Sequence, residues 1–285
     1  MNAIASIFSF GEESRILRTK NAARMMLILL TASVLASNAA FGQASKDISG
    51  SDQVARDELD AFFRNVVAEQ KYVGLGVCLV KDGKIAWEGC YGFADLEEKK
   101  PIRADTIFQL ASLSKVVTAT ALMQLYEKGL FRLDDDVSRY LPIKVRNPNF
   151  PDTPITFRML LTHTAGFSDL LPAGNKFAGM FSVSVWGDSP IPLGEFAEQL
   201  FTPGGKYYSV ELYSSEIPGT KYEYSNIAFA LIGYLVEKIS GKDFSEFCKE
   251  NIFQPLEMKD TGWHLRDLDA DRIAFGYILA PSDAI

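Results

Sequence analysis

The chain has 285 residues, of which 47% are hydrophobic and 23% are charged, a balance typical of a folded globular protein and not of a disordered one. The net charge is −7, and the sequence has no basic run of the kind that binds nucleic acid, so we expect no nucleic-acid partner. The length is sufficient for one large domain.

The amino-terminal region has the pattern of a secretory signal peptide. Basic side chains in residues 15–24 precede the apolar stretch MMLILLTASVLA (25–36), and small residues follow it. We therefore predict a signal peptide over residues 1–44 and a mature domain over 45–285, exported to the periplasm or secreted. An uncleaved membrane anchor is the less favoured alternative, because the apolar stretch is shorter than the ~20 residues that span a bilayer.

The first elements of the mature chain are predicted to be a helix and two strands. Apolar residues recur at helical spacing over 52–69, and two apolar runs follow, YVGLGVCLV and KIAWEGCYGFA. Asp82-Gly83 lies between these runs and is a strong signal for a two-residue hairpin turn.

Export would permit disulfides, so the cysteines bear on stability. If Lys81 pairs with Lys84, Cys78 lies opposite Trp87 and Cys90 opposite Leu75, and the two thiols point to opposite faces of the ribbon. Without a bulge they should not bond. Cys248 falls in a predicted helix, and we expect three buried thiols.

Further along the chain, a helix is expected from Ala111 or Ser112 to Gly129. The acidic run 134–136 could suggest a cation site, but a helix N-cap is the favoured interpretation. Residues 142–218 are rich in Pro, Gly and Ser and predict a loop-rich subdomain. Within it TFRMLLTHTAGF predicts a short helix ending at Gly166, and PLGEFAEQLF predicts another. IAFALIGYLVEKISGK then predicts a helix closed by Gly241.

One residue in the helix near Ser112 requires an explanation. The stretch FQLASLSKVVTATALMQL (108–125) contains a single charged residue, Lys115, on what is otherwise an apolar helix. Ser112 precedes it by one helical turn, so both side chains emerge on the same face. This S-x-x-K spacing lets a lysine take the proton of a serine nucleophile. The motif alone is weak, because Ser112 could be an N-cap and Lys115 a lysine whose charged end reaches water.

A second motif strengthens the catalytic interpretation. The tripeptide Y-S-N, residues 224–226, presents a phenol and an amide from a turn just before a helix. Together with LASLSK, LLTHTAGF and PGTKYEYSNIAFALIGYLVEKISG, it resembles the serine β-lactamase-related family, which includes class C β-lactamases, D,D-carboxypeptidases and related esterases. The resemblance extends from about residue 52 to 263.

This resemblance implies a role for each matching residue. Ser112 would be the acylated nucleophile, Lys115 would share its proton, Tyr224 would transfer protons, and Asn226 would hold the lysine or the carbonyl side of the substrate. It also implies a β-lactamase/transpeptidase-like α/β fold (an α+β sandwich), with an antiparallel sheet flanked by helices and a helical subdomain. The Y-S-N motif, in place of S-D-N, and the lack of an E-x-x-L-N stretch place the chain nearer to class C and the esterases than to class A.

Other catalytic arrangements are less favoured. His163 is expected to satisfy backbone groups where the short helix ends, with a catalytic role as the weaker alternative, and His264 is weaker still. The sequence has no G-x-S-x-G elbow, no His and Cys cluster with zinc spacing and no complete phosphate loop, so we expect neither a metal nor a cofactor.

The third motif of the family, K-T-G or H-x-G on a strand, does not occur after Asn226. We therefore expect a chain that lacks the C-terminal strands and one oxyanion donor, and that acylates slowly. The leading hypothesis is an exported serine hydrolase acting through an acyl-serine intermediate on a small-molecule or peptidoglycan-derived substrate: a β-lactam, a D-Ala-D-Ala peptide or a small ester. The alternative is a non-catalytic penicillin-recognising or wall-binding remnant.

Overall fold

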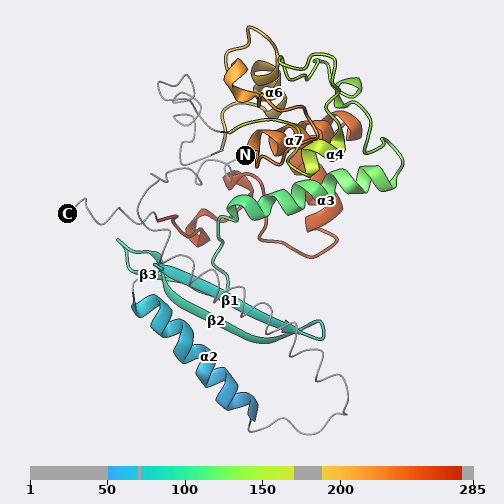
Figure 1. Ribbon diagram of the computed structural model, residues 1–285. Coiled ribbons are helices and arrows are strands. Elements are labelled where there is room, and N and C mark those ends of the chain that lie inside the picture. Colours follow the sequence, from blue (N-terminus) through green and yellow to red (C-terminus); the bar gives the residue numbers. More distant parts are fainter. Residues whose placement is uncertain (1–50, 70–71, 170–187, 278–285) are drawn as a thin grey trace, which may run out of the picture. The chain divides into compact units, whose positions relative to one another are not determined.

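The computed structural model describes residues 51–69, 72–169 and 188–277, so the predicted signal peptide lies outside the described residues (Figure 1). The chain divides into two compact units at Ala104–Asp105. Within the described ranges, no helix is both long enough and apolar enough to cross a membrane.

The first unit, which ends at Ala104, is a small antiparallel sheet covered by one helix. The strands follow the order β1-β2-β3, and the ring of Phe63 on the helix stacks on Trp87 and Tyr91 of β2 at centroid distances of 5.7 and 5.8 Å. The predicted helix and hairpin are confirmed. The elements are α2 (Ser51–Ala68), β1 (Gly74–Lys81), β2 (Lys84–Asp95) and β3 (Lys100–Pro101).

The register of the hairpin differs from the prediction. The pairing next to the turn is as expected, but a β-bulge close to the turn then shifts the register by one residue. Cys78 therefore lies opposite Glu88, and Cys90 lies opposite Gly76. Because a bulge inserts one extra residue into one strand, it reverses the face on which every later side chain of that strand points.

This shift changes the outcome for the cysteines. Cys78 and Cys90 lie on the same face of the ribbon, where the prediction put them on opposite faces, and both are exposed. Only Cys248 is buried, as predicted. The expectation of three buried thiols was therefore wrong for the two hairpin cysteines, since the ribbon leaves that face open in the described part of the chain.

The second unit, from Asp105 onward, is helical and is built around α7 (Asn226–Ser240). Helices α3, α4, α6 and α8 all contact α7. The ribbons of α3, α4 and α6 are labelled beside that of α7 in Figure 1. Most of α7 is buried, including Leu231 and Leu235, which is the pattern of a helix in the centre of a core. The other α-helices are α3 (Ser114–Glu127), α4 (Phe157–Leu161), α6 (Leu193–Phe201) and α8 (Phe244–Cys248).

Short helical turns complete this unit. They connect the α-helices and carry several of the polar contacts described below. They are η2 (Ala111–Leu113), η3 (Val137–Arg139), η4 (Val210–Leu212), η5 (Lys249–Phe253), η6 (Leu265–Asp267) and η7 (Ala270–Arg272).

The predicted helix ends are confirmed with one exception. Gly129 and Gly241 have φ values of +70° and +71°, so each ends its helix in the left-handed conformation that glycine adopts without steric cost. Helix α4, however, ends at Leu161 and not at Gly166. The reason is that His163 adopts a φ of +56°, which a right-handed helix cannot include.

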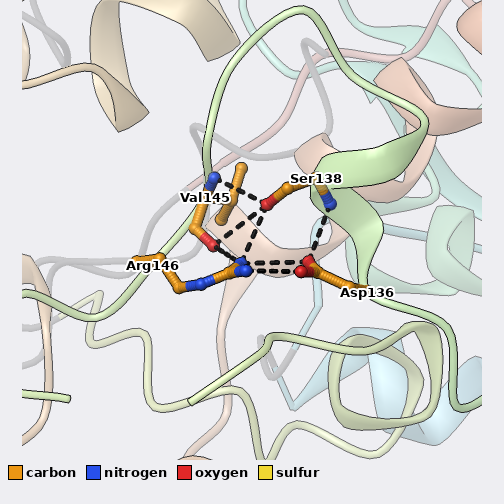
Figure 2. A network of polar contacts seen from close by, with 4 residues as sticks. All are labelled: Asp136, Ser138, Val145 and Arg146. Carbon is orange, nitrogen blue, oxygen red and sulfur yellow. Dashed lines mark hydrogen bonds and ion pairs between the residues drawn. The ribbon is translucent and has the colours of Figure 1, made fainter. Parts of the chain in front are cut away.

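The acidic run 134–136 provides a helix cap, as the sequence indicated, and it also forms two ion pairs. Asp136 is the N-cap of η3, accepts a hydrogen bond from Ser138 N–H and pairs with Arg146 (Figure 2). Asp134 pairs with Arg158 at 2.7 Å. Because the side chains of Asp136 and Arg146 are both largely buried, their bond ties the entry of η3 to the chain that leads towards α4.

Candidate active site

Ser112 and Lys115 lie where the chain enters α3. Ser112 belongs to the turn η2, and Lys115 is one turn further on, from where its Nζ donates a hydrogen bond to Ser112 Oγ at 3.3 Å. The residue before the serine, Ala111, has a φ of +47°. A left-handed alanine is strained, and such strain is typical of sites where a reactive side chain must be presented in one orientation.

Tyr224 and Asn226 reach the same point from the start of α7. The hydroxyl of Tyr224 lies 2.7 Å from Ser112 Oγ, and Asn226 Oδ1 accepts a hydrogen bond from Lys115 Nζ at 2.5 Å. The structure thus brings together all four residues that the sequence singled out, although more than a hundred residues separate the two pairs. Ser112 Oγ is in contact with two groups that could exchange a proton with it.

Aromatic rings surround the ammonium group of Lys115. Its Nζ lies 4.7 Å from the ring centroid of Tyr224 and 5.7 Å from that of Phe229. None of the described carboxylates forms an ion pair with it. Lys115 is therefore held by a serine oxygen, an amide oxygen and two aromatic faces, which is the environment of a lysine with a polar task and not of one that only extends into water.

Asp169 is a residue of this site that sequence reasoning missed. Its carboxylate accepts hydrogen bonds from the hydroxyl of Ser225 at 3.0 Å, from Ile227 N–H at 3.3 Å and from Asn226 N–H. Burial raises the pKa of Asp169, and the donors at the start of α7 act in the opposite direction. No spacing rule relates Asp169 to the Y-S-N motif, so only the fold could reveal the contact.

The two histidines differ in their relation to this site. Nδ1 of His163 accepts a hydrogen bond from Ser225 N–H at 3.0 Å, so this ring does bind a backbone group, as predicted, but one on a distant segment. It is not placed as the base of a triad, because the partners of Ser112 Oγ are Lys115 and Tyr224. His264 lies elsewhere, with its Nδ1 3.8 Å from Asp188.

A cavity of ≈ 660 Å³ adjoins Lys115. Its walls come from α3, α7 and the segments 189–193, 241–245 and 263–266, and they combine rings such as Phe229 and Trp263 with polar groups such as Glu237. Burial raises the pKa of Glu237. The volume lies in the range of small-molecule sites, so the space beside Lys115 could receive part of a substrate.

No metal-binding arrangement is present in residues 51–69, 72–169 and 188–277. In these ranges no group of three or more His, Cys, Asp or Glu side chains is placed to hold a metal ion. The polar groups around Ser112 are a hydroxyl, an amine, a phenol and an amide, a set suited to proton transfer and not to cation binding.

The sheet and helices, with S-x-x-K at the start of one helix and Y-S-N at the start of another, define the β-lactamase/transpeptidase-like fold. The octameric penicillin-binding protein homologue from Pyrococcus abyssi is similar, with a TM-score of 0.63 and 30% identity over 79% of this chain and 48% of that chain. A class C β-lactamase has a TM-score of 0.59 at 22% identity, over 81% of this chain and 57% of that one, and shows the fold alone.

Residues 59–284 match the model of the Beta-lactamase family, so the chain belongs to this family of serine hydrolases. Among its relatives, penicillin-binding protein 4* of Bacillus subtilis is 31% identical over 79% of this chain and 46% of its own length. Esterase EstB of Burkholderia gladioli is 32% identical over 72% of this chain and 50% of its own length. The chain spans about half the length of the curated relatives it matches.

Proposed function

We propose that this chain is an acyl-transfer serine hydrolase with Ser112 as the nucleophile. One observation carries the proposal: Ser112 Oγ lies within hydrogen-bonding distance of both Tyr224 OH, at 2.7 Å, and Lys115 Nζ, at 3.3 Å. A serine hydroxyl reacts poorly until a base takes its proton, and two candidate bases contact this one. Membership in a family of serine hydrolases supports the same chemistry.

The proposed reaction has two half-steps. Ser112 Oγ bonds to the carbonyl carbon of the substrate while its proton passes to Tyr224 or to Lys115 in its neutral amine form, and that proton then goes to the leaving group as the bond to it breaks. Water next attacks the acyl-serine, the same groups take and return a proton, and the acid is released. Asn226 orients Lys115 through the bond between its Oδ1 and Nζ.

The substrate class we propose is a β-lactam, a D-Ala-D-Ala peptide or a small ester. The β-lactam and the ester follow from what two relatives are named for, a penicillin-binding protein and an esterase. The D-Ala-D-Ala peptide follows from the resemblance to D,D-carboxypeptidases. A β-lactam, a peptide and an ester each present a carbonyl carbon that a serine can attack. The cavity beside Lys115 offers room for a side group.

Export to the periplasm or medium is part of the proposal. It rests on the basic, apolar and small-residue order of residues 1–44. Amino-terminal sequencing of the protein recovered from the periplasm or medium should begin near Ser45. Recovery of the intact amino terminus in the membrane fraction would favour the anchor instead.

The test is covalent labelling of the intact chain. Incubation with a fluorophosphonate and, separately, with penicillin should add one adduct mass, which peptide mapping places on Ser112. Ser112→Ala should take no label. Ser114→Ala is the matched control two residues away and should label normally. Mapping of the adduct to another serine would refute the assignment.

The second candidate function is the alternative set out in the sequence analysis, a penicillin-recognising protein that does not turn its ligand over. A penicillin-recognising protein without turnover would form the adduct but keep it. A hydrolase frees its serine by attack of water on the acyl-serine, so the lifetime of the adduct distinguishes the two functions. Release of product from a chromogenic cephalosporin or a short-chain nitrophenyl ester indicates the hydrolase, and an adduct that persists for hours indicates the binding protein.

A further inference from the structure

His163 occupies a strained position fixed by contacts with a distant segment. Its φ of +56° is uncommon for a residue other than glycine. Its carbonyl accepts a hydrogen bond from Glu223 N–H at 2.7 Å, and its Nδ1 accepts one from Ser225 N–H at 3.0 Å. The two bonds hold the backbone on either side of Tyr224, so the strain is maintained by the segment that carries the phenol.

The bond to Ser225 defines the charge state of the ring. A backbone N–H can only donate, so Nδ1 of His163 must carry a lone pair and the imidazole must be neutral. Burial lowers the pKa of His163, and the positive charge of Lys115 lowers it further. Both effects favour the form that can accept this hydrogen bond.

The imidazole ring also contacts the phenol directly. Its centroid lies 4.6 Å from that of Tyr224 at an interplanar angle of 31°, and 5.1 Å from that of Phe229. Tyr222 meets it edge-on at 5.8 Å. Ring packing and the hydrogen bond from Ser225 N–H therefore both position Tyr224, whose hydroxyl reaches Ser112 Oγ.

We propose that neutral His163 is a positioning residue for Tyr224, holding the phenol oxygen at Ser112 Oγ through the Ser225 backbone and through ring packing. The role of Tyr224 in proton transfer, on which this rests, belongs to the proposed function. The geometry of Tyr224 in the resting protein does not depend on that role. Protonation of His163 removes the acceptor for Ser225 N–H and places a second positive charge near Lys115.

The groups that face His163 set this pH dependence. Lys115 is the nearby cation, Tyr222 and Tyr224 are titratable rings, and Phe229 is apolar. Asp169 accepts a hydrogen bond from the hydroxyl of the same Ser225, so it is the carboxylate linked to His163 through this residue. Of these groups, only Asp169 carries a negative charge that could offset an imidazolium, and it already accepts three hydrogen bonds.

Three substitutions separate the two contacts. His163→Asn keeps an acceptor near the position of Nδ1 and a residue that tolerates positive φ, but it loses the ring. His163→Phe keeps a ring and loses the acceptor. His163→Ala loses both. Lys128→Ala, at the far end of α3, is the control for labelling, and His264→Asn removes the other histidine for the resonance measurement.

The first readout is the rate of fluorophosphonate labelling of Ser112 between pH 5 and 9. His163→Ala and His163→Phe should label on the order of ten- to a hundredfold more slowly than the wild type at pH 8, because a small displacement of a catalytic group has effects of this size. His163→Asn should stay within about fivefold, since the acceptor is the stronger constraint. Lys128→Ala, at the far end of α3 from Ser112, should match the wild type at every pH.

The second readout needs no activity. The amide resonance of Ser225 should shift with pH below about 6.5, the ordinary pKa of histidine, in the wild type and in His264→Asn, and this shift should vanish in His163→Asn. The inference is overturned if the shift persists in His163→Asn, or if labelling of His163→Ala stays within twofold of the wild type. A wild type that takes no label refutes the proposed function, while the Ser225 shift still decides whether His163 holds this segment.

Discussion

The two helix starts that form the site are built in opposite ways. At α7, the side chain of Ser225 caps the helix by accepting from Ala228 N–H, and Asp169 and His163 bind the backbone around it. At α3, the positions before the helix are occupied by Leu110 and Leu113, whose side chains offer no acceptor. The chain enters through the short turn η2 after a left-handed alanine.

This difference indicates a division of labour. The Y-S-N side is a fixed frame, because Glu223 N–H, Ser225 and Asn226 are each bonded to a residue of another segment. The serine side has fewer anchors, and two of its apolar side chains, Leu113 and Val116, are 65% exposed. Substitutions on the Y-S-N side should therefore affect mainly the free energy of unfolding. Substitutions on the serine side should affect mainly the rate at which Ser112 is labelled.

The largest effect should come from Lys115→Ala. Removing a group that takes the serine proton should slow labelling of Ser112 by about a hundredfold or more, while the fold survives because the position is only partly buried. Labelling rates measured by intact mass would show this, with Lys128→Ala at the far end of the same helix as the control. Normal labelling of Lys115→Ala would mean that the lysine has no part in the chemistry.

The frame should respond more in stability. Asp169→Ala removes three hydrogen bonds, and after allowing for relief of the buried carboxylate we expect a loss of about 2 kcal/mol in the free energy of unfolding. Urea titration would measure it as a lower midpoint at unchanged slope. Asp134→Ala, which breaks an exposed ion pair, should leave the urea midpoint nearly unchanged. Equal losses of stability in Asp169→Ala and Asp134→Ala would contradict the interpretation of the Y-S-N side as a fixed frame.

A smaller effect concerns pH. The pKa of His163 is lowered in the folded state, so as pH falls below the unfolded value of about 6.5 the unfolded chain binds a proton that the folded chain resists. This group therefore contributes nothing above pH 6.5 and reduces stability below it, by at most ~1.4 kcal/mol per pH unit. The difference in unfolding free energy between wild type and His163→Asn should vary with pH below 6.5 and be constant above. If this difference is the same at every pH, protonation of His163 does not contribute to the pH dependence of stability.

The smallest effect should come from Ala111→Gly. Glycine relieves the left-handed strain of about 1 kcal/mol but loses most of this gain to the greater freedom of the unfolded chain, so stability should rise by less than about 0.5 kcal/mol. Ala119→Gly, inside α3, should instead lower it by about 1 kcal/mol. Thermal unfolding compares the two. If both substitutions destabilise alike, the φ of Ala111 stores no strain.

Much of this molecule was determined by local sequence. The start and end signals of α7, Ser225 before it and Gly241 after it, act within a few residues and could be identified without a fold. The spacing of Ser112 and Lys115 is likewise a property of one helical turn. For the same reason the helix and hairpin of the first unit, and the Asp136 cap, agreed with the prediction.

Other features depended on contacts that no local pattern contains. The bulge in the β1–β2 hairpin reversed the face of Cys78 relative to Cys90, because register depends on how two strands pack and not on the turn alone. Helix α4 stopped at Leu161 because His163 turns away to meet Ser225, sixty-two positions later. Tertiary hydrogen bonds outweighed local helix propensity there.

The residues of the site also fall into two groups, those that the sequence identified and those that only the structure placed. The sequence alone named Ser112, Lys115, Tyr224 and Asn226, since each falls in a short motif whose chemistry requires those residue types. Only the tertiary structure placed Asp169 and His163 beside them, because a buried carboxylate and a neutral imidazole become binding partners only when a folded chain brings unpaired N–H groups within 3.3 Å.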